Sequence, residues 1–269
     1  CRPASIRPFG LVFTNRGLSS GYLPASCTGE GQYDFSRLDA NMKREAEEFG
    51  LRGTLYPVFG GWWRKYLPAW FVKKHGDEIY PQSHDGHIGV GGGNRFHPAL
   101  KKLWIDYAAA LGRHLKENPN LFMAMFMGEM YHHVGRKPAD NTARLEDGYS
   151  PVARSEFRKY LRNKYETIDA LNKELQAGYA DFEAIQPPTG VETRYRLTPF
   201  LYEFETFRHE SAHELEMAVF KAYKEADPSH HLTSMGGSHS EFDELTLDAI
   251  GTNSGGFGLS HHYPFSMCH

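Results

Sequence analysis

The feature that most constrains the fold is an unbroken apolar run near the middle of the chain. It reads Leu-Phe-Met-Ala-Met-Phe-Met-Gly from Leu121 to Gly128, and Glu129 follows directly. A run without polar alternation is typical of a strand buried on both faces, as in a parallel sheet covered by helices. The carboxyl ends of such strands build the active sites of α/β barrels, so Glu129 is a catalytic candidate. The alternative is an acidic residue that only caps the next turn.

Length and composition exclude several classes of protein. The chain has 269 residues, of which 40% are hydrophobic, which is enough for one large α/β domain or two small ones. A net charge of -3 without a basic block offers no electrostatic surface for nucleic acid. No stretch reaches the ~18 consecutive apolar residues of a membrane span, and the start lacks a signal-peptide pattern. We therefore expect a soluble protein without nucleic acid or a membrane span. The compartment stays open, and Cys1 in place of Met favours a truncated start.

Strands and helices are predicted to alternate along the chain. The predicted strands are Phe9–Phe13, Thr54–Phe59, Leu121–Glu129, His231–Met235 and Asp248–Thr252. The predicted helices run from Asp34 to Phe49, from Leu100 to Leu115 and from Leu201 to Ala226, and Gly50 is placed to cap the first. A polar stretch and two further helices, Ala153–Tyr165 and Thr167–Ala177, form an insertion at about residues 135–188. This order favours right-handed βαβ units, in a barrel rather than an open sheet.

Four motifs carry a resemblance to a known family. They are Gly31 to Asp39, Pro68 to Trp70, Asn94 to Pro98 and the stretch from Phe157 to Asn172 that ends in Tyr-Glu-Thr-Ile-Asp-Ala-Leu-Asn. In order and spacing they resemble the family 42 glycoside hydrolases over roughly residues 31–253. The resemblance implies a retaining TIM-type (β/α)8 barrel whose acid/base glutamate ends the fourth strand, which is the position of Glu129. Residues 1–269 would then be one catalytic barrel domain that is incomplete, with strands two to six and the insertion after strand four.

Two departures from the family pattern concern the chemistry. Gly128 stands where the family has an Asn that is implied to bind a sugar hydroxyl. Retaining hydrolysis also needs a nucleophilic carboxylate about 5–5.5 Å from the acid/base. The resemblance implies that this nucleophile ends the seventh strand, and the chain stops before it. The acidic residues of the long helix are instead predicted to be solvated helix charges, namely Glu203, Glu205, Glu210 and Glu214.

Several side chains are candidates for binding a sugar. Arg95 matches the family's motif arginine, which is implied to hold substrate near the acid/base, and a structural ion pair is the alternative. Trp62 and Trp63 follow a predicted strand and could stack on sugar faces, whereas Trp70 is as easily explained by packing. Polar side chains after other predicted strands could bind hydroxyl groups, namely His132, His239, His262 and Tyr263. The expected ligand is an oligosaccharide or glycoside without a cofactor, and a homo-oligomer is compatible with the sequence.

Two rival functions stay open. His209-Glu210-Ser211-Ala212-His213 fits the H-E-x-x-H pattern, in which two histidines on one helix face bind zinc and the glutamate acts as base. A third ligand at the spacing of the main peptidase classes is missing, so a surface helix is the simpler interpretation of this pattern. The other rival is a non-catalytic carbohydrate-binding descendant of the barrel, which Gly128 and the missing nucleophile favour.

Overall fold

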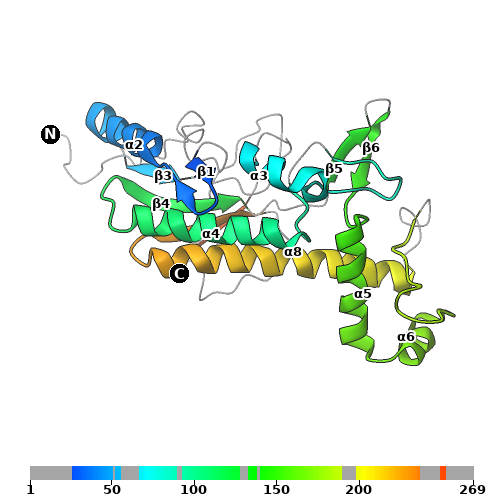
Figure 1. The fold of residues 1–269 in the computed structure, drawn as a ribbon. Helices are drawn as coiled ribbons and strands as arrows, with labels where there is room; N and C mark the ends of the chain where they lie inside the picture. Colours follow the sequence, from blue (N-terminus) through cyan, green and yellow to red (C-terminus); the bar gives the residue numbers. More distant parts are fainter. Residues whose placement is uncertain are drawn as a thin grey trace.

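The apolar run forms the strand β4 (Leu121–Met127). In the computed structural model, β4 belongs to a four-stranded sheet with the order β3-β4-β7-β8 (Figure 1). Its other strands are β3 (Gly53–Leu55), β7 (His231–Gly236) and β8 (Ala249–Thr252). All three pairings are parallel. Leu121 and Ala124 are fully buried, as expected for a strand covered on both faces.

The structure describes residues 26–50, 52–55, 67–89, 93–127, 133–137, 140–189, 198–236 and 249–252. The strand predicted at Phe9–Phe13 lies outside these residues. The other four predicted strands are confirmed where the structure describes them, with ends that differ by a few residues.

The parallel register defines one edge of the sheet. Met127 of β4 pairs with Met235 of β7, and Gly236 pairs with Thr252 of β8. These carboxyl ends lie along one side of the sheet, which we call the carboxyl edge. The chain therefore leaves β4, β7 and β8 at the same side, as the βαβ prediction requires.

Local signals explain where the helices begin and end. Helix α2 (Ser36–Phe49) ends at Gly50, which has φ of 65° and caps the helix in the left-handed conformation, as predicted. Helix α4 (Pro98–Leu115) begins with a proline, and α8 (Pro199–Ala226) begins after Thr198, whose hydroxyl accepts the Leu201 N–H. Within the described residues, no helix combines the length and the apolar character that crossing a membrane would need.

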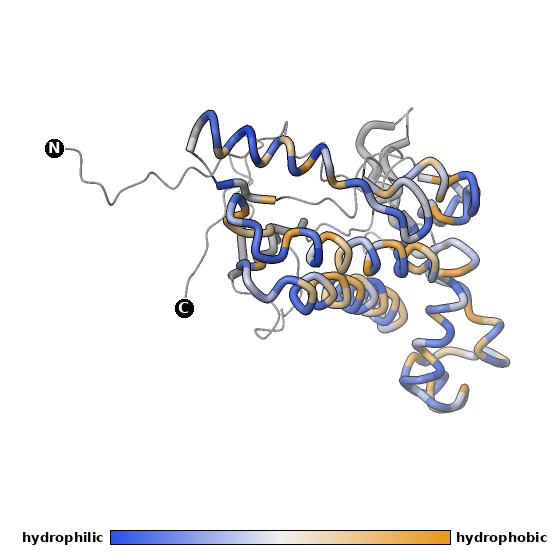
Figure 2. Tube along the Cα trace, turned by 60° about the vertical axis from the view of Figure 1, so that its left-hand side comes forward, coloured by the Kyte–Doolittle hydropathy of each residue, from blue (hydrophilic) through white to orange (hydrophobic). Residues whose placement is uncertain are grey.

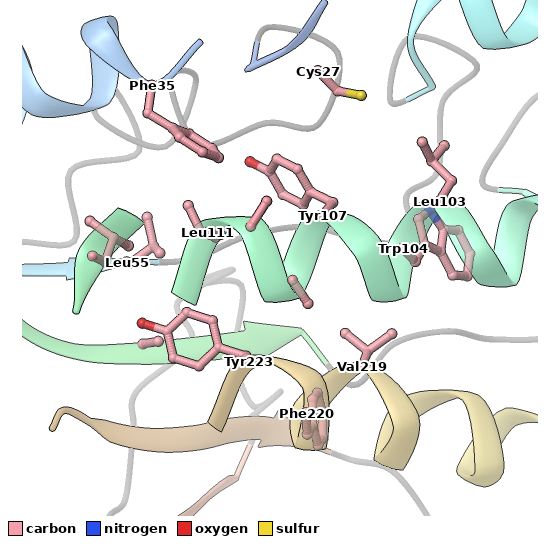
Figure 3. Close-up of a cluster of buried hydrophobic side chains, with 14 of the residues drawn as sticks. Cys27, Phe35, Leu55, Leu103, Trp104, Tyr107, Leu111, Val219, Phe220 and Tyr223 are labelled. Atoms are coloured by element: carbon pink, nitrogen blue, oxygen red, sulfur yellow. The ribbon is translucent and has the colours of Figure 1, made fainter. Parts of the chain in front are cut away.

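The main core lies between the sheet and two long helices. Helices α4 and α8 run beside each other, and their apolar sides turn inward (Figure 2). Trp104, Tyr107 and Leu111 of α4 and Phe220 and Tyr223 of α8 are almost fully buried in this core (Figure 3).

The two helices are in close contact at Gly112. A Cβ atom there would lie 2.7 Å from the Tyr223 carbonyl oxygen and 2.9 Å from Ala226 Cβ. The glycine thus permits helix contact that a side chain would block.

A strand pair and a short helical segment also precede α4. Strands β1 (Cys27–Gly29) and β2 (Gln32–Tyr33) form an antiparallel pair. Helix α3 (Ala69–His75) continues into a 3-10 helix at Gly76–Ile79. Trp70 of α3 packs against the main core, and its indole N–H donates to the Cys27 carbonyl oxygen at 3.1 Å. Trp70 is therefore a packing residue, one of the two interpretations of the sequence.

The segment after β4 builds a second core beyond the carboxyl edge. It contains an antiparallel hairpin of β5 (His133–Lys137) and β6 (Asp140–Glu146), which the sequence did not predict. Helices α5 (Pro151–Tyr165) and α6 (Ile168–Leu175) follow and confirm the two predicted helices. Residues of α5, α6 and the first half of α8 share this core, namely Phe157, Leu161, Leu171, Leu175, Phe204 and Phe207. Figure 1 shows α5 crossing this half of α8.

A buried polar cluster joins two strands at the amino end of the sheet, opposite the carboxyl edge. Asp227 caps α8 and is 0% exposed. Its carboxylate lies 2.8 Å from Nδ1 of His230 and accepts hydrogen bonds from the hydroxyl groups of Ser229 and Tyr223. Nε2 of His230 lies 3.0 Å from the carbonyl oxygen of Asn118, in the turn before β4. The cluster thus ties the start of β7 to the start of β4.

Candidate functional site

The carboxyl edge is the part of the sheet where the predicted site would lie. Met127 is the last residue of β4, and Glu129 follows it by two positions. Glu129 itself lies outside the described residues. The same holds for most of the predicted substrate-binding residues, namely Trp62, Trp63, His132, His239, His262 and Tyr263. Their convergence on one site stays a prediction.

Arg95 is the predicted substrate-binding residue that the structure describes. Its guanidinium is buried, with 2% of the side chain exposed, and Nη1 lies 2.5 Å from Oδ2 of Asp147. Nη2 donates to the carbonyl oxygen of Arg208 at 3.3 Å, and Cζ lies 4.6 Å from the centre of the Phe96 ring. Burial lowers the pKa of the Arg95 guanidinium, and the Asp147 carboxylate opposes this change. Arg95 therefore forms the buried ion pair that was its alternative interpretation, and contact with a substrate stays a prediction.

Asp147 receives a second guanidinium from α8. Nε and Nη2 of Arg208 each lie 3.3 Å from Oδ1 of Asp147, and Arg208 is 1% exposed. On its outer side, Nη1 of Arg208 donates to both carboxylate oxygens of Glu205 at 2.8 and 2.9 Å. One buried carboxylate thus binds two buried cations, and a half-exposed glutamate supplies further negative charge.

Neither Asp147 nor Arg208 could be identified from the sequence. Asp147 lies at the end of a polar stretch without periodicity, and Arg208 lies in a helix whose glutamates were predicted to be solvated. The length of α8 was the signal that could have located them. A helix much longer than the strand that follows it, here β7, must project beyond the sheet, and its projecting part can bury charged residues.

The residues beside this ion-pair network are also held by buried polar contacts. Nδ2 of Asn94 donates to Ser150 Oγ at 3.0 Å and to the Glu78 carbonyl oxygen at 3.1 Å. Ser150 Oγ in turn accepts the Ala153 N–H and caps α5. Asn94 and Arg95 of one motif therefore bind Ser150 and Asp147 of the segment that returns from the hairpin.

The H-E-x-x-H pattern lies on α8. His209 and Glu210 are exposed, and His213 is half-buried. Across the residues that the structure describes, no group of three His, Cys, Asp or Glu side chains is arranged to hold a metal ion. The pattern thus finds no third ligand within the described part of the chain.

Glu203 corrects one prediction, because it is buried rather than solvated. Its side chain is 8% exposed, and Lys164 Nζ lies 2.8 Å from both carboxylate oxygens. The hydroxyl groups of Tyr165 and Tyr160 donate to Oε1 and Oε2 at 2.9 and 3.3 Å. These contacts link α5 to α8, because Glu203 faces the second core and not solvent. Burial raises the pKa of both tyrosines, and the charge of Glu203 and its hydrogen bonds to them raise it further. Glu210 and Glu214 are exposed and Glu205 is half-exposed, nearer to the prediction.

A cleft of about 380 Å³ lies beside this contact. Tyr165, Glu174, Tyr202 and Glu203 line it together with residues of α6 and the start of α8. Tyr202 is 62% exposed there. The cleft belongs to the helical part after the hairpin and not to the end of β4, so we do not assign it to the reaction.

Comparisons with known proteins relate the chain to beta-galactosidases. The sequence profile of the glycoside hydrolase 42 family, described as beta-galactosidase, matches residues 28–251. The beta-galactosidase of an Arthrobacter species is 30% identical over 186 residues, which are 66% of this chain and 24% of that enzyme. The beta-galactosidase BbgII of Bifidobacterium bifidum is 23% identical over 226 residues, 80% of this chain and 31% of that enzyme. The chain thus spans a quarter to a third of the length of these relatives.

Solved structures share the fold at low sequence identity. The catalytic domain of beta-amylase from Paenibacillus polymyxa has a TM-score of 0.68 at 14% identity, covering 91% of this chain and 71% of that one. Beta-galactosidase from Bacillus circulans has a TM-score of 0.62 at 19% identity, covering 84% of this chain and 33% of that one. The family profile spans Arg95, Asp147 and Arg208 of the ion-pair network and the parallel sheet as far as Gly251 in β8. The chain therefore belongs to the beta-galactosidase family, glycoside hydrolase family 42.

Proposed function

We propose that the chain is part of a glycoside hydrolase that cleaves a β-linked sugar with retention, and that Glu129 is its general acid and base. The observation that carries the proposal is that the family match runs through β4 and that Glu129 follows the end of this strand by two residues. Carboxyl ends of parallel strands are where α/β barrels place catalytic residues. The four parallel strands would be part of an incomplete (β/α)8 barrel, with the hairpin and helices after β4 as an insertion at about residues 135–188.

The proposed reaction has two steps. Glu129 first donates its proton to the glycosidic oxygen while a second carboxylate attacks the anomeric carbon, which breaks the bond to the leaving group and forms a glycosyl-enzyme. Glu129, now ionised, then takes a proton from water as the water oxygen displaces the second carboxylate. The first step requires a protonated Glu129, which burial and the charge of the second carboxylate would favour. That nucleophile is not identified in this chain.

The names of the relatives support a substrate class. The curated relatives compared above are both beta-galactosidases, so a β-galactoside is the first candidate. Trp62 and Trp63 would stack on the sugar face, and imidazole or phenol groups after other strands would bind its hydroxyls, namely His132, His239, His262 and Tyr263. Arg95 would act behind this layer through its ion pair with Asp147.

The proposal is tested with the complete polypeptide on a panel of chromogenic aryl β-glycosides. We expect hydrolysis of the β-galactoside, and proton NMR of the first product should show the β-anomer before it mutarotates. Inversion at the anomeric carbon would contradict the two-carboxylate mechanism, and failure to hydrolyse any β-glycoside would contradict the activity.

One residue favours a second candidate function. Gly128 stands beside Glu129 where the family motif has Asn, so a sugar hydroxyl loses a partner next to the reacting carbon. A carbohydrate-binding protein without hydrolysis would bind galactose or lactose in calorimetry and show no turnover in the same panel. These two readouts separate the candidates.

A further inference from the structure

Asp147 lies at the level of the carboxyl edge. Helix α4 has 18 residues and spans about 27 Å, whereas β4 has 7 residues and spans about 23 Å. A short turn joins them and both contribute to the same core, so the start of α4 is level with the end of β4 (Figure 1). Arg95 comes shortly before this start and binds Asp147.

The second partner of Asp147 reaches the same level from α8. Arg208 precedes Ala226, the end of α8, by 18 positions, which is about 27 Å along the helix. β7 starts at the amino end of the sheet, a few residues after α8 ends. Arg208 and the start of α4 are therefore at about the same distance from the amino end of the sheet. Asp147, Arg95 and Arg208 therefore meet at the level of the carboxyl edge.

Asp147 also closes the segment that Glu129 opens. The chain leaves the sheet at Met127, forms the β5–β6 hairpin and ends β6 at Glu146, directly before Asp147. Beyond Asp147 the backbone is held again, because the Tyr149 N–H donates to the Gln82 carbonyl oxygen at 3.2 Å. The returning end of this segment is thus fixed to residues from two other parts of the chain.

Asp147 is the carboxylate that both buried guanidiniums share, and the charge of the buried Glu216 acts on Arg95 more weakly. The two guanidiniums are each 1% or 2% exposed. Replacing the Asp147 carboxylate with an amide leaves two adjacent buried cations with less compensation, and such cations repel each other. Replacing Glu205, which is half-exposed, leaves the outer guanidinium accessible to solvent on that side.

We propose that Asp147 is a positioning residue of the active site, which fixes the returning end of the segment that carries Glu129 and holds Arg95 at the same edge. This inference rests on the proposed function, because it assigns Asp147 to the reaction that Glu129 would catalyse. Asp147 would act through the positions of Glu129 and Arg95, without touching the substrate.

The chain offers a matched control at the other end of the sheet. Asp227 is also a buried aspartate with several polar partners, but it joins the starts of β4 and β7. Asp147→Asn and Asp227→Asn should both lower the free energy of unfolding. Loss of stability alone would affect both variants alike, whereas a positioning role affects only the first.

The test compares these two variants in the complete enzyme, at a temperature where both are folded. For Asp147→Asn we expect kcat to fall at least tenfold with KM changed less than threefold, and for Asp227→Asn both constants should stay within twofold. Hydrogen exchange of residues 133–146 should quicken more than tenfold in Asp147→Asn and stay unchanged in Asp227→Asn.

Equal kinetics and equal hairpin exchange in the two variants would overturn the inference. Should Asp147→Asn not fold, Arg208→Lys takes its place, since it keeps the charge and loses the planar two-point contact; Glu205→Gln is then the control. A wild-type enzyme without glycosidase activity overturns the proposed function and the catalytic part of the inference. Faster hairpin exchange would in that case support only a structural anchor at Asp147.

Discussion

Nδ1 of His230 lies 2.8 Å from Oδ2 of Asp227, and this contact joins the end of α8 to the first residue before β7. Burial alone would raise the pKa of Asp227, but hydrogen bonds from Ser229, His230 and Tyr223 together with the His230 charge outweigh it and hold the pKa below its ordinary value. The ionised carboxylate is therefore the form that the folded protein stabilises.

This lowered pKa predicts how stability depends on pH. A group whose pKa is lower in the folded state stabilises the fold above its unfolded pKa, about 3.9 for Asp, and that contribution is lost as pH falls through the folded pKa. Asp227→Asn should lower the free energy of unfolding by about 2 kcal/mol at pH 7, and the difference from wild type should shrink below about pH 4. Urea titrations at pH 7 and at several lower pH values measure it. A difference that does not change with pH would contradict the ionised state of Asp227.

Gly112 is predicted to be essential for contact between α4 and α8. Alanine is the better helix former by about 1 kcal/mol, but its Cβ would lie 2.7 Å from the Tyr223 carbonyl oxygen. Overpacking of this kind costs about 1–3 kcal/mol, so Gly112→Ala should lower the melting temperature. Gly178→Ala is the control, since a Cβ there meets nothing within 4 Å. A Gly112→Ala variant as stable as wild type would show that the helices can move apart at little cost.

Removing Glu203 should lower the free energy of unfolding more than removing its partner Lys164. Glu203→Ala leaves the hydroxyls of Tyr160 and Tyr165 without their acceptor and should cost about 3 kcal/mol. Lys164→Ala removes a side chain that is 42% exposed and should cost less than about 1 kcal/mol. Chemical denaturation of both variants compares the two values, and equal losses would place the stabilisation in the ion pair rather than in the hydroxyl hydrogen bonds.

If α8 serves only to pack the core, its H-E-x-x-H pattern should bind no zinc. We expect purified protein to contain less than about 0.1 equivalent of zinc after dialysis. His213→Ala should leave that value unchanged. Stoichiometric zinc that His209→Ala removes would revive the peptidase interpretation.

The parallel sheet and long helices could be predicted because local patterns specify them. The apolar run of β4, the glycine after α2 and the proline at the start of α4 each carry their own signal. The hairpin after β4 could not be predicted, since its sequence is polar and lacks the alternation of a half-buried strand.

The ion-pair network shows why the site was harder to predict than the fold. Arg95 was singled out from a family motif, but its partner Asp147 lies 52 positions away and Arg208 lies 113 positions away. No local pattern relates residues so far apart, because a buried charge finds its partner only after the helices pack. Glu203 was wrongly predicted as solvated for the same reason.

Comparing Glu129→Gln with wild type in the complete enzyme tests the role of Glu129 most directly. We expect kcat on an alkyl β-galactoside, whose leaving group needs a proton, to fall at least a thousandfold, while binding of galactose stays within about threefold. Glu210→Gln, an exposed glutamate of α8, should leave both values unchanged. If Glu129→Gln turned over substrate as fast as wild type, Glu129 could not be the general acid and base.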